Sequence, residues 1–307
     1  MSKKVLVIGG SYFAGRVFAM IAAREAGFEL TFVNRGRYSM SMLPNVREFA
    51  CDRHDADGLR ALPDEEYDAV VDFCAYTPEE VHTLLTNLPG TYGKYILLST
   101  ADIYDRSFVG AKNEESAVMT AQPAGPAGEY MFNKALCEAA ACILCEEKGI
   151  ALTVLRPAFI YGPYNYAPRE SWFIQKIVAG EEIPVPTDSE AKFQFVYVKD
   201  VANAIIACVN SDVCAGKAYN LAAPEVLDYA GFMETLRSVS DLPVKTCGVT
   251  VEQVLRQQIP LPFPLLPEEN ELFDGSRICR ELGLQYTPFA DGMSKAYQAF
   301  KSVYASR

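Results

Sequence analysis

Three polar side chains in the middle of the chain are of the types that can move a proton to or from a hydroxyl group. Tyr130 and Lys134 are spaced so that they share one face of a helix. An unassisted tyrosine has a pKa of about 10, and a neighbouring ammonium group favours the phenolate and lowers that pKa towards working range. Thr100 can donate a hydrogen bond to the oxygen whose proton moves. The three residues therefore predict acid–base chemistry at a carbon that carries a hydroxyl group.

The expected secondary structure brings these residues together. Residues 94–98 are an apolar run typical of a buried strand, and Thr100 follows it closely. The Gly-, Pro- and Ala-rich stretch 105–128 predicts a long active-site loop, and 129–148 predict the helix that bears the tyrosine and the lysine. A Tyr-x-x-x-Lys pair taken alone is more often a tyrosine at a core edge beside a solvated lysine. Its position behind a strand end is what favours catalysis.

The N-terminal residues predict a dinucleotide-binding unit. Residues 5–8 form a branched apolar strand that runs into a turn with Gly9, Gly10 and Gly15, followed by a helix and a second strand at 30–33. Glycines let the turn be tight and bring backbone N–H groups close to a pyrophosphate at the positive end of the helix. Strand, glycine turn, helix and strand within about 30 residues are the signature of this unit.

The residues at the end of the second strand indicate which dinucleotide the protein prefers. Asn34 stands about where an acidic residue often binds the ribose 2′-hydroxyl, and Arg35 and Arg37 lie beside it. Two arginines suit a 2′-phosphate, so the sequence favours NADP over NAD. The alternative is that both arginines are solvated loop charges.

Strands alternate with helices along most of the chain, which predicts an α/β fold with a doubly wound, parallel Rossmann sheet. The expected strands are 5–8, 30–33, 47–50, 67–73, 94–98, 151–155, 195–198 and 219–221. We expect residues 1–165 and 194–222 to form the NAD(P)-binding domain. Residues 166–193 and 223–307 are expected to form a smaller, mostly C-terminal α/β lobe that binds the substrate.

Within that lobe the pattern is less regular. Residues 172–179 predict a helix, and 181–192 predict an irregular polar stretch. The C-terminal part predicts two or three helices broken by the proline-dense segment 259–267.

The composition indicates which kinds of partner the protein can bind and in which cellular compartment it is expected. The 307-residue chain has a formal net charge of -11, which argues against a nucleic-acid surface. Nine scattered cysteines predict reduced thiols in a cytoplasmic protein, and the pair Cys142 and Cys145 is expected to pack within a buried helix. With only two histidines a histidine-based metal site is not expected, and no apolar run reaches the length of a membrane span.

Several motifs in order along the chain resemble the extended short-chain dehydrogenase/reductases of the NAD-dependent epimerase/dehydratase family, and most of all a subgroup with a G-G-x-x-x-x-G turn. They are Gly9-Gly10 with Phe13 and Gly15; Asp52-Arg53-x-Asp55; Ser99-Thr100 with Tyr104; Tyr130-x-x-x-Lys134; Leu155-Arg156-Pro157 with Tyr161-Gly162-Pro163; Val198-x-Asp200-Val201-Ala202; and Tyr219-Asn220. Together they cover residues 4 to about 222.

The resemblance implies roles for individual residues. Thr100, Tyr130 and Lys134 would be the catalytic triad, with hydride transfer to and from a sugar or similar carbon. Lys134 would also hold the nicotinamide ribose, and Asp52 the adenine amine. The lysine acts together with an oxidised nicotinamide in lowering the pKa of Tyr130. The residues expected at the cofactor are Gly9, Gly10, Tyr12, Phe13, Gly15, Asn34, Arg35, Arg37, Asp52, Arg53, Cys74, Ala75, Ser99, Tyr130, Lys134 and Pro157.

Three positions depart from the family pattern. Tyr12 stands where a second glycine is common, which puts a side chain near the pyrophosphate. Phe193 falls where members that use sugar nucleotides tend to have an arginine. Asp102 occupies the place of a glutamate acid in the dehydratases, although a loop aspartate bonded to backbone is the preferred interpretation.

Two classes of function therefore remain open. The first is an enzyme, an NAD(P)-dependent epimerase, dehydratase or reductase that acts on a small molecule such as a sugar or sugar nucleotide. The second is a non-catalytic NAD(P)-binding regulator or an RNA-binding protein, since the resembling subgroup includes chloroplast proteins that bind RNA stem-loops. The resemblance also implies a homodimer through the helix that bears Tyr130 and the helix before it.

Overall fold

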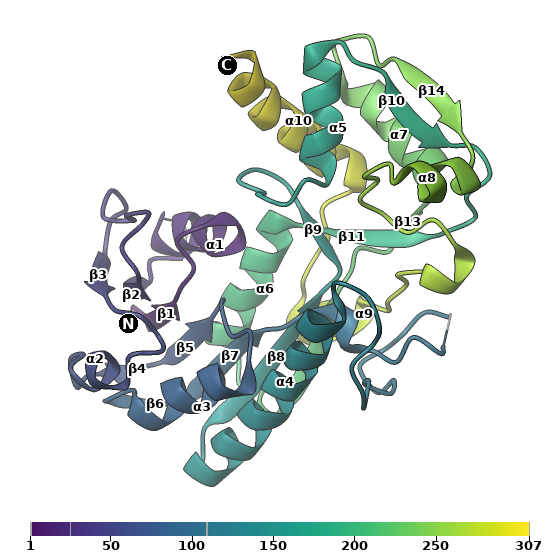
Figure 1. Cartoon of the computed structure of the whole chain (residues 1–307). Helices are drawn as coiled ribbons and strands as arrows, with labels where there is room; N and C mark the ends of the chain where they lie inside the picture. Colours follow the sequence, from purple (N-terminus) through teal and green to yellow (C-terminus); the bar gives the residue numbers. More distant parts are fainter. Residues whose placement is uncertain (1, 25, 109, 307) are drawn as a thin grey trace.

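The computed structural model describes residues 2–24, 26–108 and 110–306. Its centre is a seven-stranded parallel sheet with the order β12-β8-β7-β5-β1-β2-β3 (Figure 1). The strands are β1 (Lys4–Ile8), β2 (Glu29–Asn34), β3 (Val46–Ala50), β5 (Ala69–Asp72), β7 (Lys94–Leu98), β8 (Ala151–Pro157) and β12 (Lys217–Leu221). The strand order reverses beside β1, which is the topology of a doubly wound Rossmann sheet. The predicted fold class is confirmed.

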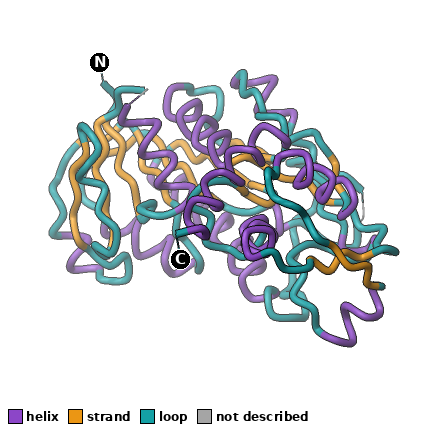
Figure 2. Tube along the Cα trace, turned by 90° about the horizontal axis from the view of Figure 1, so that it is seen from above, coloured by secondary structure: helices purple, strands orange, loops and turns teal. Residues whose placement is uncertain are grey.

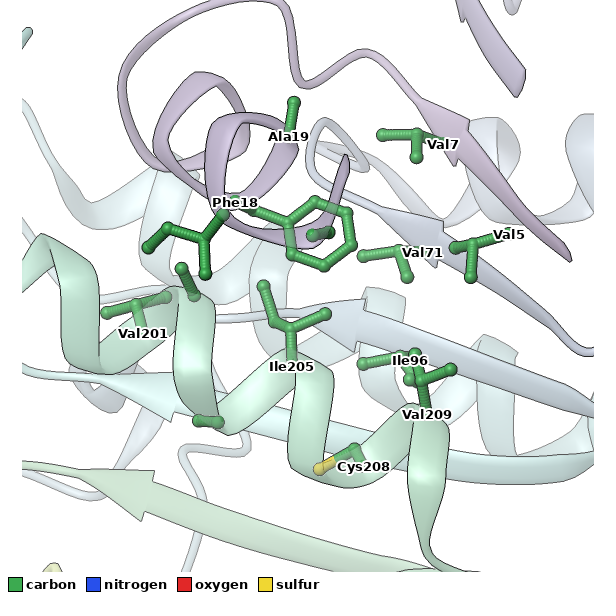
Figure 3. Packing of buried hydrophobic residues seen from close by; sticks show 14 of the residues in the cluster. Val5, Val7, Phe18, Ala19, Val71, Ile96, Val201, Ile205, Cys208 and Val209 are labelled. Atoms are coloured by element: carbon green, nitrogen blue, oxygen red, sulfur yellow. The ribbon is translucent and has the colours of Figure 1, made fainter. Parts of the chain in front are cut away.

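Helices cover both faces of this sheet because the side chains of its central strand alternate between two apolar clusters. The helices on one face are α1 (Phe13–Arg24) and α6 (Val198–Asn210), and those on the other are α3 (Pro78–Asn87) and α4 (Gly128–Lys148). In β1, Val5 and Val7 pack with Phe18 of α1 and Ile205 of α6 (Figure 3). The intervening residues of β1 pack into the other cluster, beneath α3 and α4. Burial on both faces explains why these strands are continuous apolar runs.

Short elements complete this part of the chain. They are α2 (Ala56–Arg60), β4 (Glu66–Tyr67), β6 (Thr91–Tyr92) and the 3-10 helix η1 (Ala101–Ile103). The start of α3 is stabilised locally, because Thr77 and Glu80 form a capping box and a proline opens the first turn.

The second lobe lies beyond the carboxyl edge of the main sheet (Figures 1 and 2). Its elements are β9 (Phe159–Tyr161), α5 (Glu170–Ala179), β10 (Ile183–Pro186), β11 (Phe193–Tyr197), β13 (Val226–Leu227), α7 (Tyr229–Val239), β14 (Thr246–Val249), α8 (Val251–Gln257), η2 (Pro267–Glu269) and α10 (Phe289–Ala305). The remaining helix, α9 (Ser276–Leu282), packs instead against β12 and α6 in the core of the main sheet. Its core is aromatic, and rings of Phe173, Phe193 and Phe263 stack on one another.

The structure corrects three expectations for this region. The stretch 181–192, expected to be irregular, contains β10, because β10 pairs with the distant strand β14. Four helices of the α type, not two or three, follow residue 223 in the described chain. The strand expected at 195–198 lies outside the main sheet, since β11 pairs with β9 and β13.

The cysteines also differ in part from expectation. All nine are free thiols, and Cys145 is buried as predicted, but Cys142 is exposed. Three residues along a helix turn a side chain by most of a revolution, so α4 buries one thiol of the pair and not the other.

We predict that Gly15→Ala destabilises the fold. A Cβ atom on Gly15 would lie 2.2 Å from the Cα of Gly10 and 2.5 Å from its carbonyl oxygen, so α1 would have to move away from the turn. Urea unfolding is expected to show a loss of about 2 kcal/mol or more, as for an overpacked core site. Gly93→Ala is the control, since its added Cβ meets no atom within 4 Å. Equal stability of the two variants would contradict the prediction.

Candidate active site

Two adjoining cavities follow the carboxyl edge of the sheet. The first, of about 460 Å³, is lined by the glycine turn, the end of β7, the start of α4 and residues of the second lobe. The second, of about 500 Å³, lies over the ends of β2 and β3. Both are lined by Ser11, Tyr12, Cys74, Tyr76 and Tyr166, so the two cavities meet at these residues. Open α/β sheets bind ligands at this edge.

The predicted site residues lie almost entirely in these two cavities. The first is lined by Gly10, Tyr12, Phe13, Gly15, Cys74, Ser99, Thr100, Tyr130, Lys134 and Pro157. The second is lined by Gly9, Tyr12, Asn34, Arg35, Arg37, Asp52, Arg53 and Cys74. Ala75 is buried outside both, and its carbonyl oxygen accepts a hydrogen bond from Lys134.

The glycine turn has the geometry that close backbone approach requires. Gly9 and Gly10 adopt φ values of +73° and +70°, which side chains rarely tolerate. Any Cβ on Gly10 would lie 2.8 Å from a methyl group of Val7. Three buried polar atoms of residues that line the cavities, the Oγ of Ser99, the Nδ2 of Asn34 and the Nε of Arg53, have no hydrogen-bond partner in the described chain. Unpaired buried polar groups are costly, so the turn and these atoms fit a polar ligand such as a dinucleotide.

Lys134 is fixed by the backbone of two strand ends. Its Nζ donates to the carbonyl oxygens of Ala75 and Leu98, each at 2.8 Å. Burial lowers the pKa of this lysine, because desolvation disfavours the ammonium form.

The structure shows which protein groups act on the pKa of Tyr130. Desolvation, followed by the negative charge of Asp102, raises the pKa of Tyr130 well above its usual value, and the charge of Arg169 opposes this rise. The lowering of this pKa that the sequence predicts needs an oxidised nicotinamide together with Lys134, and it stays a prediction.

Thr100 is oriented by Asp102. The Thr100 hydroxyl donates to the Asp102 carboxylate at 3.1 Å and accepts from the Asp102 backbone N–H at 3.2 Å. We expected the Asp102 carboxylate to bond to backbone, but it accepts a hydrogen bond from the Thr100 side chain instead. Asp102 also lines the first cavity. With the threonine proton engaged, a lone pair of the Thr100 oxygen is available to accept from a substrate hydroxyl group.

A buried ion pair sets the position of the catalytic helix. Arg156, at the end of β8, pairs with Glu138 of α4, with the shortest N–O distance 2.7 Å. Arg156 also donates to the hydroxyl of Tyr104, which donates to Asn220 of β12 at 2.7 Å. Three motifs of the sequence, around 104, 156 and 220, thus form one network that holds α4 against the sheet.

At the other cavity the carboxylate of Asp52 accepts hydrogen bonds from the backbone N–H and the ring of His54, and these bonds lower the pKa of Asp52. Asn34 accepts from the N–H of Gly36 through its Oδ1. Its free amide group is therefore a donor. Arg35 and Arg37 are exposed at the rim.

Arg53 differs from its predicted role. Its guanidinium forms a buried, two-bond ion pair with Asp72, at 2.8 and 2.9 Å, and also donates to Cys74 and to the carbonyl of Glu80. Asp72 accepts a further bond from Tyr95 at 2.7 Å. Arg53 therefore forms part of the cavity wall, with its donors mostly used by the protein itself.

Sequence reasoning missed the residues that the second lobe contributes. Tyr166 packs on Tyr12 with ring centroids 5.4 Å apart, where the two cavities meet, and Arg169 lines the first cavity. Glu271 lines the same cavity and pairs with Arg106 at 2.9 Å. Desolvation and the charge of Asp102 raise the pKa of Glu271 to about 8. No spacing in the sequence links residue 271 to the catalytic helix, so only the fold reveals it.

A buried glutamate anchors the segment that carries Tyr166 and Arg169. Glu170 accepts hydrogen bonds from the backbone N–H of Gly162 and from the amide of Asn165, the latter at 2.9 and 3.1 Å. The group is completely buried, and desolvation raises the pKa of Glu170 to about 7.

Comparison with known proteins shows the family of this chain. A model of the NAD dependent epimerase/dehydratase family matches residues 5–222, and the chain belongs to that family. Chloroplast stem-loop binding protein of 41 kDa b from Arabidopsis thaliana is 30% identical over 255 residues, 78% of this chain and 64% of that protein, a little under two thirds of its length. dTDP-glucose 4,6-dehydratase from Streptomyces niveus is 24% identical over 97% of this chain and 93% of that protein.

Solved structures share the fold. UDP-glucuronic acid 4-epimerase from Bacillus cereus, in complex with UDP-glucuronic acid and NAD, superposes with a TM-score of 0.78 at 16% identity, covering 98% of this chain and 100% of that one. The predicted family, of NAD-dependent short-chain dehydrogenase/reductase enzymes, is confirmed. Among the described residues no helix is long and apolar enough to cross a bilayer, and no cluster of potential metal ligands occurs.

Glu170 makes stability depend on pH. Because its pKa is about 7 in the fold and about 4.5 in the unfolded chain, the native state holds its proton over that interval. The contribution of Glu170 to stability should be greatest below pH 4.5 and fall by about 3 kcal/mol as pH rises to about 7. The measurement is urea unfolding of wild type and Glu170→Gln across this range, with the exposed Glu182→Gln as control. A wild-type advantage that does not shrink relative to Glu170→Gln would refute the assignment.

Proposed function

We propose that this protein is an NAD(P)-dependent oxidoreductase of the epimerase/dehydratase type that acts on a sugar or a related hydroxyl or carbonyl compound. The observation that carries the proposal is that Thr100, Tyr130 and Lys134 all line the cavity into which the glycine turn opens. Tyr130 transfers the proton of the substrate hydroxyl group, and Thr100, oriented by Asp102, contacts the same oxygen.

The cofactor supplies a hydride acceptor and donor at the substrate carbon. Backbone N–H groups of the turn that follows Gly9 bind its pyrophosphate, whereas the N–H of Gly9 itself donates to the carbonyl oxygen of Val33 at 2.9 Å. Lys134 binds the nicotinamide ribose. Asp52 binds the adenine amine. The nicotinamide pocket is formed by Ser99, Cys74 and Pro157, and Ala75 supports it through the bond that its carbonyl oxygen accepts from Lys134.

NADP is the preferred cofactor in this proposal. The free amide of Asn34 is a hydrogen-bond donor, and Arg35 and Arg37 add positive charge at the same cavity. Donors and cations suit a 2′-phosphate, whereas an acidic side chain suits the free hydroxyl groups of NAD. The solved relatives bind NAD, so this preference distinguishes the chain from them.

Sugar nucleotides are the substrate class that the relatives favour. The names of several relatives include UDP-glucuronic acid or dTDP-glucose. Asp102 and Glu271 offer hydrogen-bonding groups for sugar hydroxyls, and Phe159 and Phe273 offer apolar ring faces. We propose a nucleotide sugar as the substrate, with hydride either returned or kept.

RNA binding is the second candidate, because the chloroplast relative is named for binding stem-loops. The net charge of -11 opposes it, since nucleic-acid binding depends on neutralising phosphates. A homodimer through α4 and α3 stays a prediction, which Leu136 and Ile143, exposed apolar residues of α4, favour.

Tyr130→Phe is expected to abolish turnover and leave cofactor binding intact, because the phenol hydroxyl is needed only for proton transfer. Loss of general acid–base catalysis lowers kcat by about 100-fold or more. The assay is the conversion of UDP-glucose and dTDP-glucose with NADPH or NADP present, followed by NMR. Tyr164→Phe serves as the matched control, since this exposed tyrosine does not line the first cavity. Undiminished turnover in Tyr130→Phe would rule out its assigned role.

Calorimetric titration with NADPH and NADH tests the cofactor preference. We expect wild type to bind NADPH at least tenfold more tightly than NADH, and Arg35→Ala to weaken NADPH alone. Asn34→Asp should reverse the preference, because a carboxylate repels the 2′-phosphate and accepts from the NADH ribose. Arg24→Ala, in the last turn of α1 and away from both cavities, is the control. Equal loss of both cofactors in Arg35→Ala would contradict the assignment.

A further inference from the structure

One cationic side chain in the first cavity has no anionic partner. Lys134 and Arg169 are the cations that line this cavity, and Lys134 is engaged by two carbonyl oxygens. Within the part of the chain that the structure describes, the guanidinium of Arg169 forms neither an ion pair nor a hydrogen bond. Other arginines near the cavities differ: Arg53 pairs with Asp72, and Arg106 pairs with Glu271.

The position of Arg169 is fixed despite this missing partner. Its guanidinium lies 4.9 Å from the ring centroid of Phe159, a cation–π contact, and Phe159 lines the same cavity. The backbone N–H of Arg169 donates to the carbonyl of Ala167, and the next residue is the buried, hydrogen-bonded Glu170. The positive charge is therefore held at the cavity wall without being neutralised.

The family resemblance implies an arginine at position 193, where this chain has a phenylalanine. Phe193 is completely buried in the aromatic core of the second lobe, with its ring stacked 4.9 Å from that of Phe263. It lines neither of the two cavities. A cation that binds an anionic part of the substrate must therefore come from another element.

We propose that Arg169 binds a phosphate or diphosphate ester carried by the substrate, in place of the arginine absent at position 193. This inference rests on the proposed function and assigns the residue that binds the phosphate groups of its substrate. A guanidinium group presents paired donors that match phosphate oxygens, and an unpaired one inside a cavity leaves those donors available.

The same charge acts on the catalytic tyrosine. Arg169 is the cation that lowers the pKa of Tyr130 against the effects of desolvation and Asp102. Removing this charge should move the tyrosine-dependent limb of the pH–rate profile to higher pH. A purely structural loss would lower the rate without moving that limb.

The experiment is calorimetric titration of the NADPH-loaded protein with UDP-glucose, UDP, methyl glucoside and glucuronic acid. The variants are Arg169→Gln and Arg169→Lys, with Lys176→Gln as control, because Lys176 stacks on Trp172 of the same helix outside the cavity. We expect Arg169→Gln to weaken UDP-glucose and UDP at least tenfold and Arg169→Lys to weaken them less. Methyl glucoside should be unaffected.

The outcomes separate this inference from the proposed function. UDP-glucose that binds Arg169→Gln as tightly as wild type, yet is still turned over, overturns the role of Arg169 alone. Arg169-dependent binding of UDP without turnover of any sugar supports that role and overturns the proposed enzyme. Arg169-dependent binding of glucuronic acid but not of UDP makes the recognised anion a carboxylate, and the phosphate assignment is then wrong.

Discussion

The ion pair between Arg156 and Glu138 is the interaction on which the geometry of the active site depends. Both side chains are buried, and Arg156 adds a bond to Tyr104, which reaches Asn220. Glu138 lies one helical turn beyond Lys134, so the pair fixes both the rotation and the height of α4 relative to the sheet. Loss of one partner would leave an uncompensated buried charge, a penalty of about 3–5 kcal/mol. This contact therefore also positions Tyr130 and Lys134.

A second buried ion pair, between Arg53 and Asp72, holds the wall of the second cavity in place. Arg53 and Asp72 connect the loop after β3 to the end of β5, and Tyr95 and the N–H of Cys74 complete the network. The cavity wall is thereby rigid, while Ser99 and Asn34 keep polar atoms without partners. Satisfied buried groups hold the shape, and the unsatisfied ones face the place of a ligand.

The electrostatics of the first cavity oppose an ionised tyrosine. Burial and Asp102 both raise the pKa of Tyr130, and Lys134 is turned to backbone carbonyls. A positively charged nicotinamide and Arg169 act in the other direction. Ligand binding and the proton affinity of Tyr130 are therefore linked, so catalysis is favoured once the site is filled.

The sequence by itself determined the sheet, the glycine turn and the triad, because each depends on local patterns: apolar runs, glycines and a four-residue spacing on one helix. It could equally place Asn34, Arg35 and Arg37 at the end of β2, since strand ends follow from the runs themselves. The tertiary structure alone decided that β10 pairs with β14, that Arg53 is committed to Asp72, and that the thiols at 142 and 145 differ in burial. It alone also brought Tyr166, Arg169 and Glu271 to the cavity. These outcomes depend on contacts between segments far apart in the chain and on competition for the same donors and charges, which no local spacing encodes.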